Sequence, residues 1–211
     1  MRDYSKLRCQ FIKKAEIRKV SEEFRNTYWK SGSIPIDMES IIERGLHLDI
    51  IPHRDISRLD KIDAYLKSDL TGIVVDITQY MDPKGRYENR LRFSFAHEIG
   101  HFVLHKYMHP EFGIDTPEDY CDFVMNFPEA EYRSFEWQAN EFAGSLLVPQ
   151  DRFLEEIEHC KATLKERGVI HLWDENREQV LVSLSPPLGR VFGVSDEVIE
   201  RRITEERDLW I

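Results

Sequence analysis

Two histidines and a glutamate lie within five residues near the middle of the chain, in His97-Glu98-Ile99-Gly100-His101. On an α-helix, residues four apart project from the same face, about 6 Å apart along the axis. His97 and His101 could therefore hold one metal ion through neutral imidazole nitrogens, which are ligands that zinc favours. Glu98 would lie about 100° around the helix, where its carboxylate could reach a water beside the metal and act as general base. The pattern predicts metal-assisted hydrolysis.

A second interpretation of the two histidines is that they belong to the core. The flanking residues, from Phe93 to Leu104, are mostly apolar, and buried histidines need hydrogen-bond partners. Protein groups could satisfy His97 and His101 separately. We favour the metal because one ion would satisfy both imidazoles at once.

The helix that carries these histidines does not offer a third ligand. His105 continues the same face, but on a straight helix it lies about 12 Å from His97. Leu104 and Tyr107 stand where the metzincin motif requires glycine and histidine, so that class is excluded. The third ligand must come from another segment.

Glu136 is the better candidate, because it begins a second apolar helical pattern that ends at Pro149. Asn140 shares a helix face with Glu136. One of the two could bind the metal, while the other accepts a hydrogen bond from a ligand histidine and fixes its orientation. We expect Gly144 to allow the two helices to approach closely.

Three sequences in these helices are distinctive together: RFSFAHEIGHFVLH (residues 92–105), EWQANEFA (136–143) and LLVP (146–149). They resemble the signature of the ImmA/IrrE-type metallo-endopeptidases, and weaker likeness extends from about residue 34 to about residue 203. The resemblance implies a gluzincin-like arrangement in which His97, His101 and Glu136 bind zinc and Glu98 is the catalytic base. Members of known role cleave helix-turn-helix repressors, so the resemblance implies a protein substrate of that kind.

Hydrophobic periodicity predicts an α+β fold, mostly helical with a small β-sheet. The resemblance implies that this fold is a zincin-like metalloprotease domain. The predicted domains are an N-terminal basic helical segment (1–32), a metallopeptidase core (33–149) and a helical C-terminal region (150–211). Helices are expected at 37–45, 118–127, 136–149 and 150–168, strands at 46–52 and 72–77, a helical or irregular connection at 56–66 and a turn at 81–85. Residues 171–184 could be strand or helix. Residues 186–203 are typical of a helix-turn-helix unit in which Ser195 is the N-cap.

The composition is that of a globular protein, with 41% hydrophobic and 32% charged residues and a net charge of −10. No apolar run approaches the roughly 18 residues of a transmembrane helix, and the first twenty residues lack the apolar core of a signal peptide. We therefore expect a cytoplasmic protein without membrane contact. Cys9, Cys121 and Cys160 are odd in number and lack metal-site spacing, which favours free thiols.

Charge is unevenly distributed along the chain. Residues 1–30 contain nine Lys/Arg and four Asp/Glu, a local charge of +5. This segment could contact nucleic acid, but its apolar spacing favours helices that pack on the domain with basic residues outward. The segment 185–211 contains four arginines and six acidic residues, so direct DNA reading by the helix-turn-helix unit is not expected.

Residues 106–134 form a long connection between the two motif helices and could select the substrate as a lid, or simply pack on the surface. Peptide hydrolysis also needs a group that stabilises the oxyanion. The nearby candidates are His105, Tyr107, His109 and Tyr132, and the sequence does not rank them.

We thus expect a zinc-dependent endopeptidase. An alternative from a different class is a non-catalytic zinc-containing regulator, or a component of a toxin–antitoxin pair, that acts by binding a partner. The two hypotheses share His97, His101 and Glu136. They differ over Glu98, because hydrolysis requires its carboxylate and binding does not.

Overall fold

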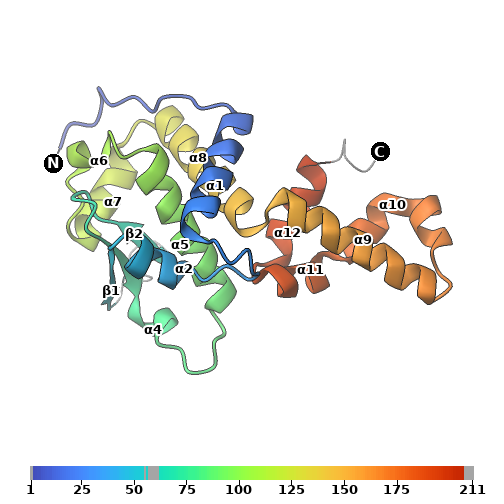
Figure 1. Cartoon of the computed structure of the whole chain (residues 1–211). Coiled ribbons are helices and arrows are strands. Elements are labelled where there is room, and N and C mark those ends of the chain that lie inside the picture. Colours follow the sequence, from blue (N-terminus) through green and yellow to red (C-terminus); the bar gives the residue numbers. More distant parts are fainter. Residues whose placement is uncertain (1, 55, 57–61, 207–211) are drawn as a thin grey trace. The chain divides into compact units, whose positions relative to one another are not determined.

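The computed structural model describes residues 2–54, 56 and 62–206, which are mostly helical with one three-stranded sheet (Figure 1). The chain forms two compact units, one of Met1–Gly32 with Asp37–Leu146 and one of Ser33–Ile36 with Leu147–Ile211. The first contains every residue predicted to form the site. Its helical elements are α1 (Lys14–Tyr28), α2 (Met38–Ser40), the π-helical turn η1 (Ile41–Gly45), α4 (Ile77–Tyr80), α5 (Glu88–Leu104), α6 (His109–Phe112), α7 (Pro117–Asn126) and α8 (Glu129–Leu147).

The sheet has the strand order β1-β3-β2, with β1 (Asp49–His53) parallel to β3 (Gly72–Asp76) and β2 (Ala64–Leu66) antiparallel to it. β3 is central and fully buried, as its β-branched sequence predicts. Pro52 lies inside β1, whereas the sequence places the end of the strand there. An edge strand tolerates proline because one side of it needs no ladder hydrogen bond. β2 is not predicted by the sequence, since three residues are too short to show a period.

α5 and α8 pack closely, and Gly100 is the residue that permits it. A Cβ at Gly100 would lie 3.1 Å from both the Cα and the carbonyl oxygen of Ala139. The prediction that Gly144 has this role is wrong, because a Cβ there would have nothing within 4 Å among the described residues.

An aromatic cluster adjoins the cavity beside these helices, and Phe112, Phe123 and Phe135 line both. Its members include Tyr4, Phe112, Phe123, Phe127 and Phe135, with ring centroids of neighbouring pairs about 4.5–6 Å apart. They come from α6, α7, the start of α8 and the N-terminal segment. The long connection between the motif helices therefore contributes to the core.

The basic N-terminal segment packs on the domain, as its apolar spacing predicts. In α1 the side chains of Ile17, Ser21 and Phe24 are buried, and Ser21 Oγ donates to the carbonyl oxygen of Phe142 at 3.3 Å. Arg18 Nε lies 2.7 Å from the buried carboxylate of Glu141. α1 extends over Lys14–Tyr28 and therefore covers only part of the segment 1–32 that was expected to be helical.

The second unit is helical, with α9 (Gln150–Glu166), α10 (His171–Ser183), α11 (Ser185–Phe192) and α12 (Asp196–Glu205). The ambiguous segment 171–184 is thus a helix, kinked at Asn176. α11 and α12 are joined by a tight turn in which Gly193 has a φ of 64°. Ser195 is at the N-cap position of α12, although its side chain does not cap the helix. Among the described residues, the helices lack the combined length and apolarity that crossing a membrane requires.

Candidate metal centre

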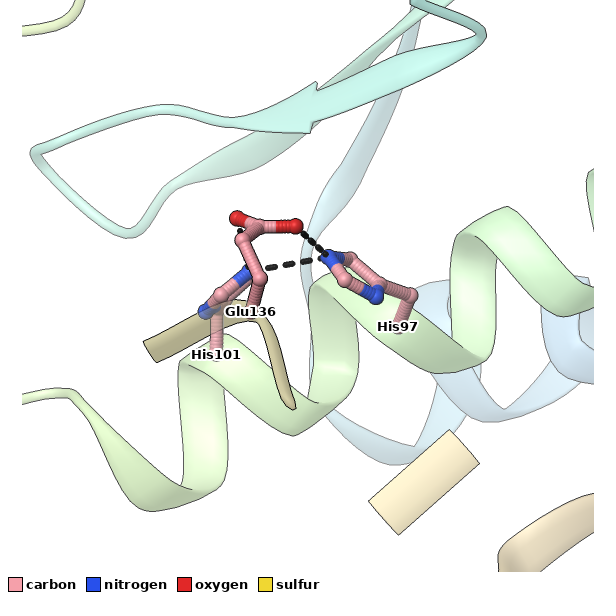
Figure 2. Close-up of side chains that lie close together, drawn as sticks. All are labelled: His97, His101 and Glu136. Atoms are coloured by element: carbon pink, nitrogen blue, oxygen red, sulfur yellow. Dashed lines mark hydrogen bonds and ion pairs between the residues drawn. The ribbon is translucent and has the colours of Figure 1, made fainter. Parts of the chain in front are cut away.

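Three side chains from two helices converge on one point. His97 and His101 lie one turn apart on α5, and Glu136 lies in the second turn of α8. The Nε2 atoms of the two histidines are 2.9 Å apart. Glu136 Oε2 is 3.3 Å from His97 Nε2, and Glu136 Oε1 is 3.5 Å from His101 Nε2. Figure 2 shows the two imidazoles and the carboxylate turned toward one another.

The cluster suits a zinc ion in size and in chemistry. One ligand atom from each of the three residues lies within 4.8 Å of the others. Zinc bonds of about 2.0–2.2 Å place the ligand atoms of a tetrahedral site about 3.3 Å apart, which is close to the observed separations. Two imidazoles and one carboxylate are also the ligand set of many catalytic zinc sites, which keep a fourth position open.

Both histidines have a partner on the side away from the cluster. Asn140 Oδ1 lies 3.1 Å from His97 Nδ1, so the structure brings the predicted pair together. His105 Nδ1 lies 3.0 Å from His101 Nδ1. Because each Nδ1 has a partner, each Nε2 is directed toward Glu136.

The charges in the cluster favour a cation. Burial lowers the pKa of His97, but the hydrogen bond and the charge of Glu136 outweigh it and raise that pKa to about 9. The pKa of Glu136 falls well below its usual value because its hydrogen bonds to His101 and His97 outweigh its burial. Burial holds the pKa of His101 well below its usual value. The carboxylate of Glu136 thus supplies negative charge beside two ring nitrogens.

Glu98 lies beside the cluster and is almost completely buried. The backbone N–H of Leu66, in β2, donates to Glu98 Oε2 at 2.8 Å. Burial raises the pKa of Glu98 to about 7; the charge of His97 opposes this shift and that of Glu136 adds to it. A carboxylate with a pKa near neutrality is suited to accept and return a proton.

A small, partly open cavity adjoins these groups. Its lining includes Glu98, His101 and Glu136 together with His109 and Tyr120. His109 is buried, and within the described part of the chain neither of its ring nitrogens has a hydrogen-bond partner. Burial, and then the charge of His105, lower the pKa of His109 to about 3, so its imidazole is neutral at pH 7 and can donate one N–H.

The structure distinguishes among the four residues that the sequence offered as candidates for stabilising the oxyanion. His105 has both nitrogens engaged, with His101 and Gln138. Tyr107 is half exposed and accepts a hydrogen bond from the backbone of Gln10. Tyr132 packs against the aromatic cluster, which leaves His109 at the cavity.

Sequence reasoning missed Tyr120 and Leu66 as residues at the site. Tyr120 is three residues before Phe123 on α7, so a tyrosine on an otherwise apolar stripe was the available signal. Leu66 acts through its backbone, for which the sequence has no signal.

The model of a peptidase family, described as the IrrE N-terminal-like domain, matches residues 86–204, more than half of the chain. The chain belongs to this family. The resemblance to ImmA/IrrE proteins is confirmed, and membership of a peptidase family gives the chain a metallopeptidase-like fold. The matched segment contains α5 and α8 but not β2, which contacts Glu98 from outside it.

A solved structure of a Mycobacterium tuberculosis transcriptional regulator is similar to 88% of this chain, at 17% sequence identity and a TM-score of 0.47. The chain spans 46% of the length of that structure. Comparison with curated proteins found no match.

Proposed function

We propose that the protein is a zinc-dependent endopeptidase with a zincin-like active site. The observation that carries the proposal is the convergence of the ligand atoms of His97, His101 and Glu136 beside Glu98, at the wall of a cavity. Family membership supports peptide hydrolysis as the reaction. The ligand roles of His97, His101 and Glu136, and the role of Glu98 as base, are part of the proposal.

A zinc ion, when bound, supplies Lewis acidity to the peptide carbonyl and to the attacking water. Glu98 accepts a proton from that water as its oxygen bonds to the carbonyl carbon. The hydrogen bond from Leu66 orients the carboxylate during this step. When the carbon–nitrogen bond breaks, Glu98 gives the proton to the leaving amine. His109 donates its N–H to the carbonyl oxygen, on which negative charge develops.

The proposed substrate is a specific cytoplasmic protein, and a helix-turn-helix transcriptional repressor is the best candidate. This part rests on the resemblance to ImmA/IrrE proteins of known role. Cleavage would then regulate transcription through the repressor.

The test compares new protein N-termini, mapped by mass spectrometry, in host cells that express the wild type or Glu98→Gln. The substitution preserves size and polarity but removes the base. We expect one or a few cleavages with the wild type only, and equimolar zinc in both purified proteins. Glu88→Gln, at an exposed glutamate of the same helix, is the matched control and should cleave as the wild type does.

Two other outcomes are informative. If both proteins hold zinc and their N-termini do not differ, the proposed hydrolysis is wrong and a non-catalytic regulator is the better description. If neither protein holds zinc, the proposed metal site is wrong.

A further inference from the structure

The imidazole of His101 is connected, on its side away from the cluster, to a line of polar groups that ends at the N-terminal segment. His101 Nδ1 is 3.0 Å from His105 Nδ1, and His105 Nε2 is 3.2 Å from Gln138 Oε1. Gln138 Nε2 is 3.0 Å from the backbone carbonyl oxygen of Gln10. His105 and Gln138 are completely buried. Three hydrogen bonds therefore join a candidate metal ligand to the backbone of residue 10.

The carbonyl oxygen of Gln10 determines the direction of the first bond because it can only accept. Gln138 must present its amide NH₂ to this oxygen. The same NH₂ also lies 3.1 Å from Ser134 Oγ and 3.5 Å from Cys9 Sγ, both of which can accept. The amide oxygen of Gln138 must then face His105.

The remaining two bonds follow from that orientation. An amide oxygen only accepts, so His105 donates from Nε2. His105 is completely buried and neither of its bonded partners is a carboxylate, so the cationic form is disfavoured and its Nδ1 is an acceptor. His101 must therefore donate from Nδ1.

This tautomer places the lone pair of His101 on Nε2, the atom that faces His97 and Glu136. A neutral imidazole binds a metal through its lone pair. The opposite tautomer would direct an N–H at the cluster and could not bind there. Phe135 holds the two rings in place, with its centroid 3.9 Å from that of His101 and 4.4 Å from that of His105.

We propose that Gln138, held in one orientation by the backbone carbonyl of Gln10 in the N-terminal segment, selects the metal-binding tautomer of His101 through His105. Gln138 and His105 are thus positioning residues. Two further hydrogen bonds fix the segment, from the backbone N–H of Cys9 to Glu131 and from that of Gln10 to the hydroxyl of Tyr107, each 2.8 Å long. The effect of the tautomer on zinc affinity rests on the proposed metal site. The assignment of the tautomer does not, because it follows from the hydrogen bonds and the burial of His105.

The test measures zinc affinity and the His101 tautomer in the full chain carrying Gln138→Leu. Zinc affinity is measured by competition with a chromophoric chelator, and the tautomer by long-range ¹H–¹⁵N NMR of the histidine rings without added metal. We expect the zinc Kd to rise about 10-fold to 100-fold, as for other partners of metal-binding histidines, and the Nδ1–H form of His101 to lose its dominance. Gln150→Leu, the same substitution at an exposed glutamine outside the network, is the matched control and should leave the zinc Kd and the tautomer unchanged.

A second pair of variants tests the same network at His105. Asparagine can place an oxygen near the position of Nδ1 and accept from His101, whereas phenylalanine cannot. We therefore expect His105→Phe to weaken zinc binding and His105→Asn to restore part of it. This pair decides the matter if Gln138→Leu does not fold, as judged by far-UV circular dichroism.

The inference is overturned if folded Gln138→Leu keeps the wild-type tautomer and zinc Kd, or if the two His105 variants bind zinc equally. A wild type that binds no zinc would refute the proposed metal site. In that case the NMR spectrum of Gln138→Leu would still decide whether the network selects the tautomer.

Discussion

Glu98 and His109 line the same cavity. Burial shifts the pKa of each in the direction that favours the neutral side chain. For Glu98 the raised pKa, about 7, makes the carboxylate a better proton acceptor near neutral pH. For His109 the lowered pKa, about 3, keeps one nitrogen protonated and the other free. Burial thus suits Glu98 to the proposed role of base and His109 to the proposed role of neutral hydrogen-bond donor.

We predict that His109→Phe lowers kcat by about 10²-fold to 10³-fold, the effect of losing one oxyanion donor. Zinc content should stay equimolar because His109 is not among the candidate ligands. The rate is measured on the protein whose cleavage the N-terminal mapping identifies. Glutamine can place an N–H in the same region, so His109→Gln should recover part of kcat. If His109→Phe cleaves at the wild-type rate, His109 does not stabilise the oxyanion.

The spacing between α5 and α8 is decided at Gly100. We predict that Gly100→Ala lowers the free energy of unfolding by about 1–3 kcal/mol, because the new methyl group would press on the backbone of Ala139. Zinc affinity should also fall, since the proposed ligands lie on these two helices. Urea denaturation and chelator competition measure the two effects.

Gly144→Ala is the matched control, on α8 with open space around the added methyl group. It should raise the free energy of unfolding by up to about 1 kcal/mol, because alanine favours a helix more than glycine does. Equal changes in the two variants would show that helix approach does not depend on Gly100.

α7 begins with a capping box, and this element carries Tyr120 to the cavity. Thr116 Oγ1 accepts from the backbone N–H of Asp119, and Asp119 Oδ2 accepts from the backbone N–H of Thr116. We predict that Thr116→Ala lowers the free energy of unfolding by about 1 kcal/mol at pH 7, measured by urea denaturation.

The capping box should also depend on pH. The hydrogen bond from Thr116 lowers the pKa of Asp119 in the folded state. The stability that the Asp119 carboxylate contributes is therefore fully present above its pKa in the unfolded chain, about 3.9. It is lost as the pH falls through the lower pKa of the folded state. The difference between wild type and Thr116→Ala should narrow as the pH is lowered below about 4. A difference that is constant with pH would exclude the carboxylate from the cap.

At the scale of the whole molecule, the N-terminal third contacts a candidate site whose main residues lie in the matched segment 86–204. α1 is held on α8 by Arg18 and Lys14, which lie 2.7 Å and 3.8 Å from the carboxylate oxygens of Glu141. Glu141 is buried, whereas Arg18 is about a quarter exposed. Part of the positive charge of this segment is thus paired with an acidic side chain of the same chain.

We predict that Arg18→Ala lowers the free energy of unfolding by about 1–3 kcal/mol. This value is below the roughly 3–5 kcal/mol of a fully buried pair because Arg18 is partly solvated and Lys14 remains near Glu141. Lys19→Ala, at an exposed lysine of the same helix, is the control and should change stability by less than about 0.5 kcal/mol. If both variants unfold alike, the Arg18–Glu141 pair does not hold α1 in place.

The sequence by itself determined the family, the helices that carry the candidate ligands and the central strand. These follow from local patterns: two histidines four residues apart, Glu136 and Asn140 on one face, and a run of β-branched residues at 72–77. Such patterns can be read because residues near in sequence are near on the same element. The shared face of Glu136 and Asn140 was predictable for this reason. The contact of Asn140 with His97, on the other helix, followed only from the expected metal site.

Only the tertiary structure decided which groups from other elements reach the site. Leu66 contacts Glu98 through its backbone N–H, and Gln10 contacts Gln138 through its carbonyl oxygen, so their side-chain types carry no signal. Gly100 and Gly144 are both glycines on neighbouring helices, and only their packing shows which one lies where the helices approach. His109 stands out among the polar residues of its segment because folding buries it at the cavity without a partner among the described residues. Burial and long-range contact are properties of the packed chain, which local sequence does not encode residue by residue.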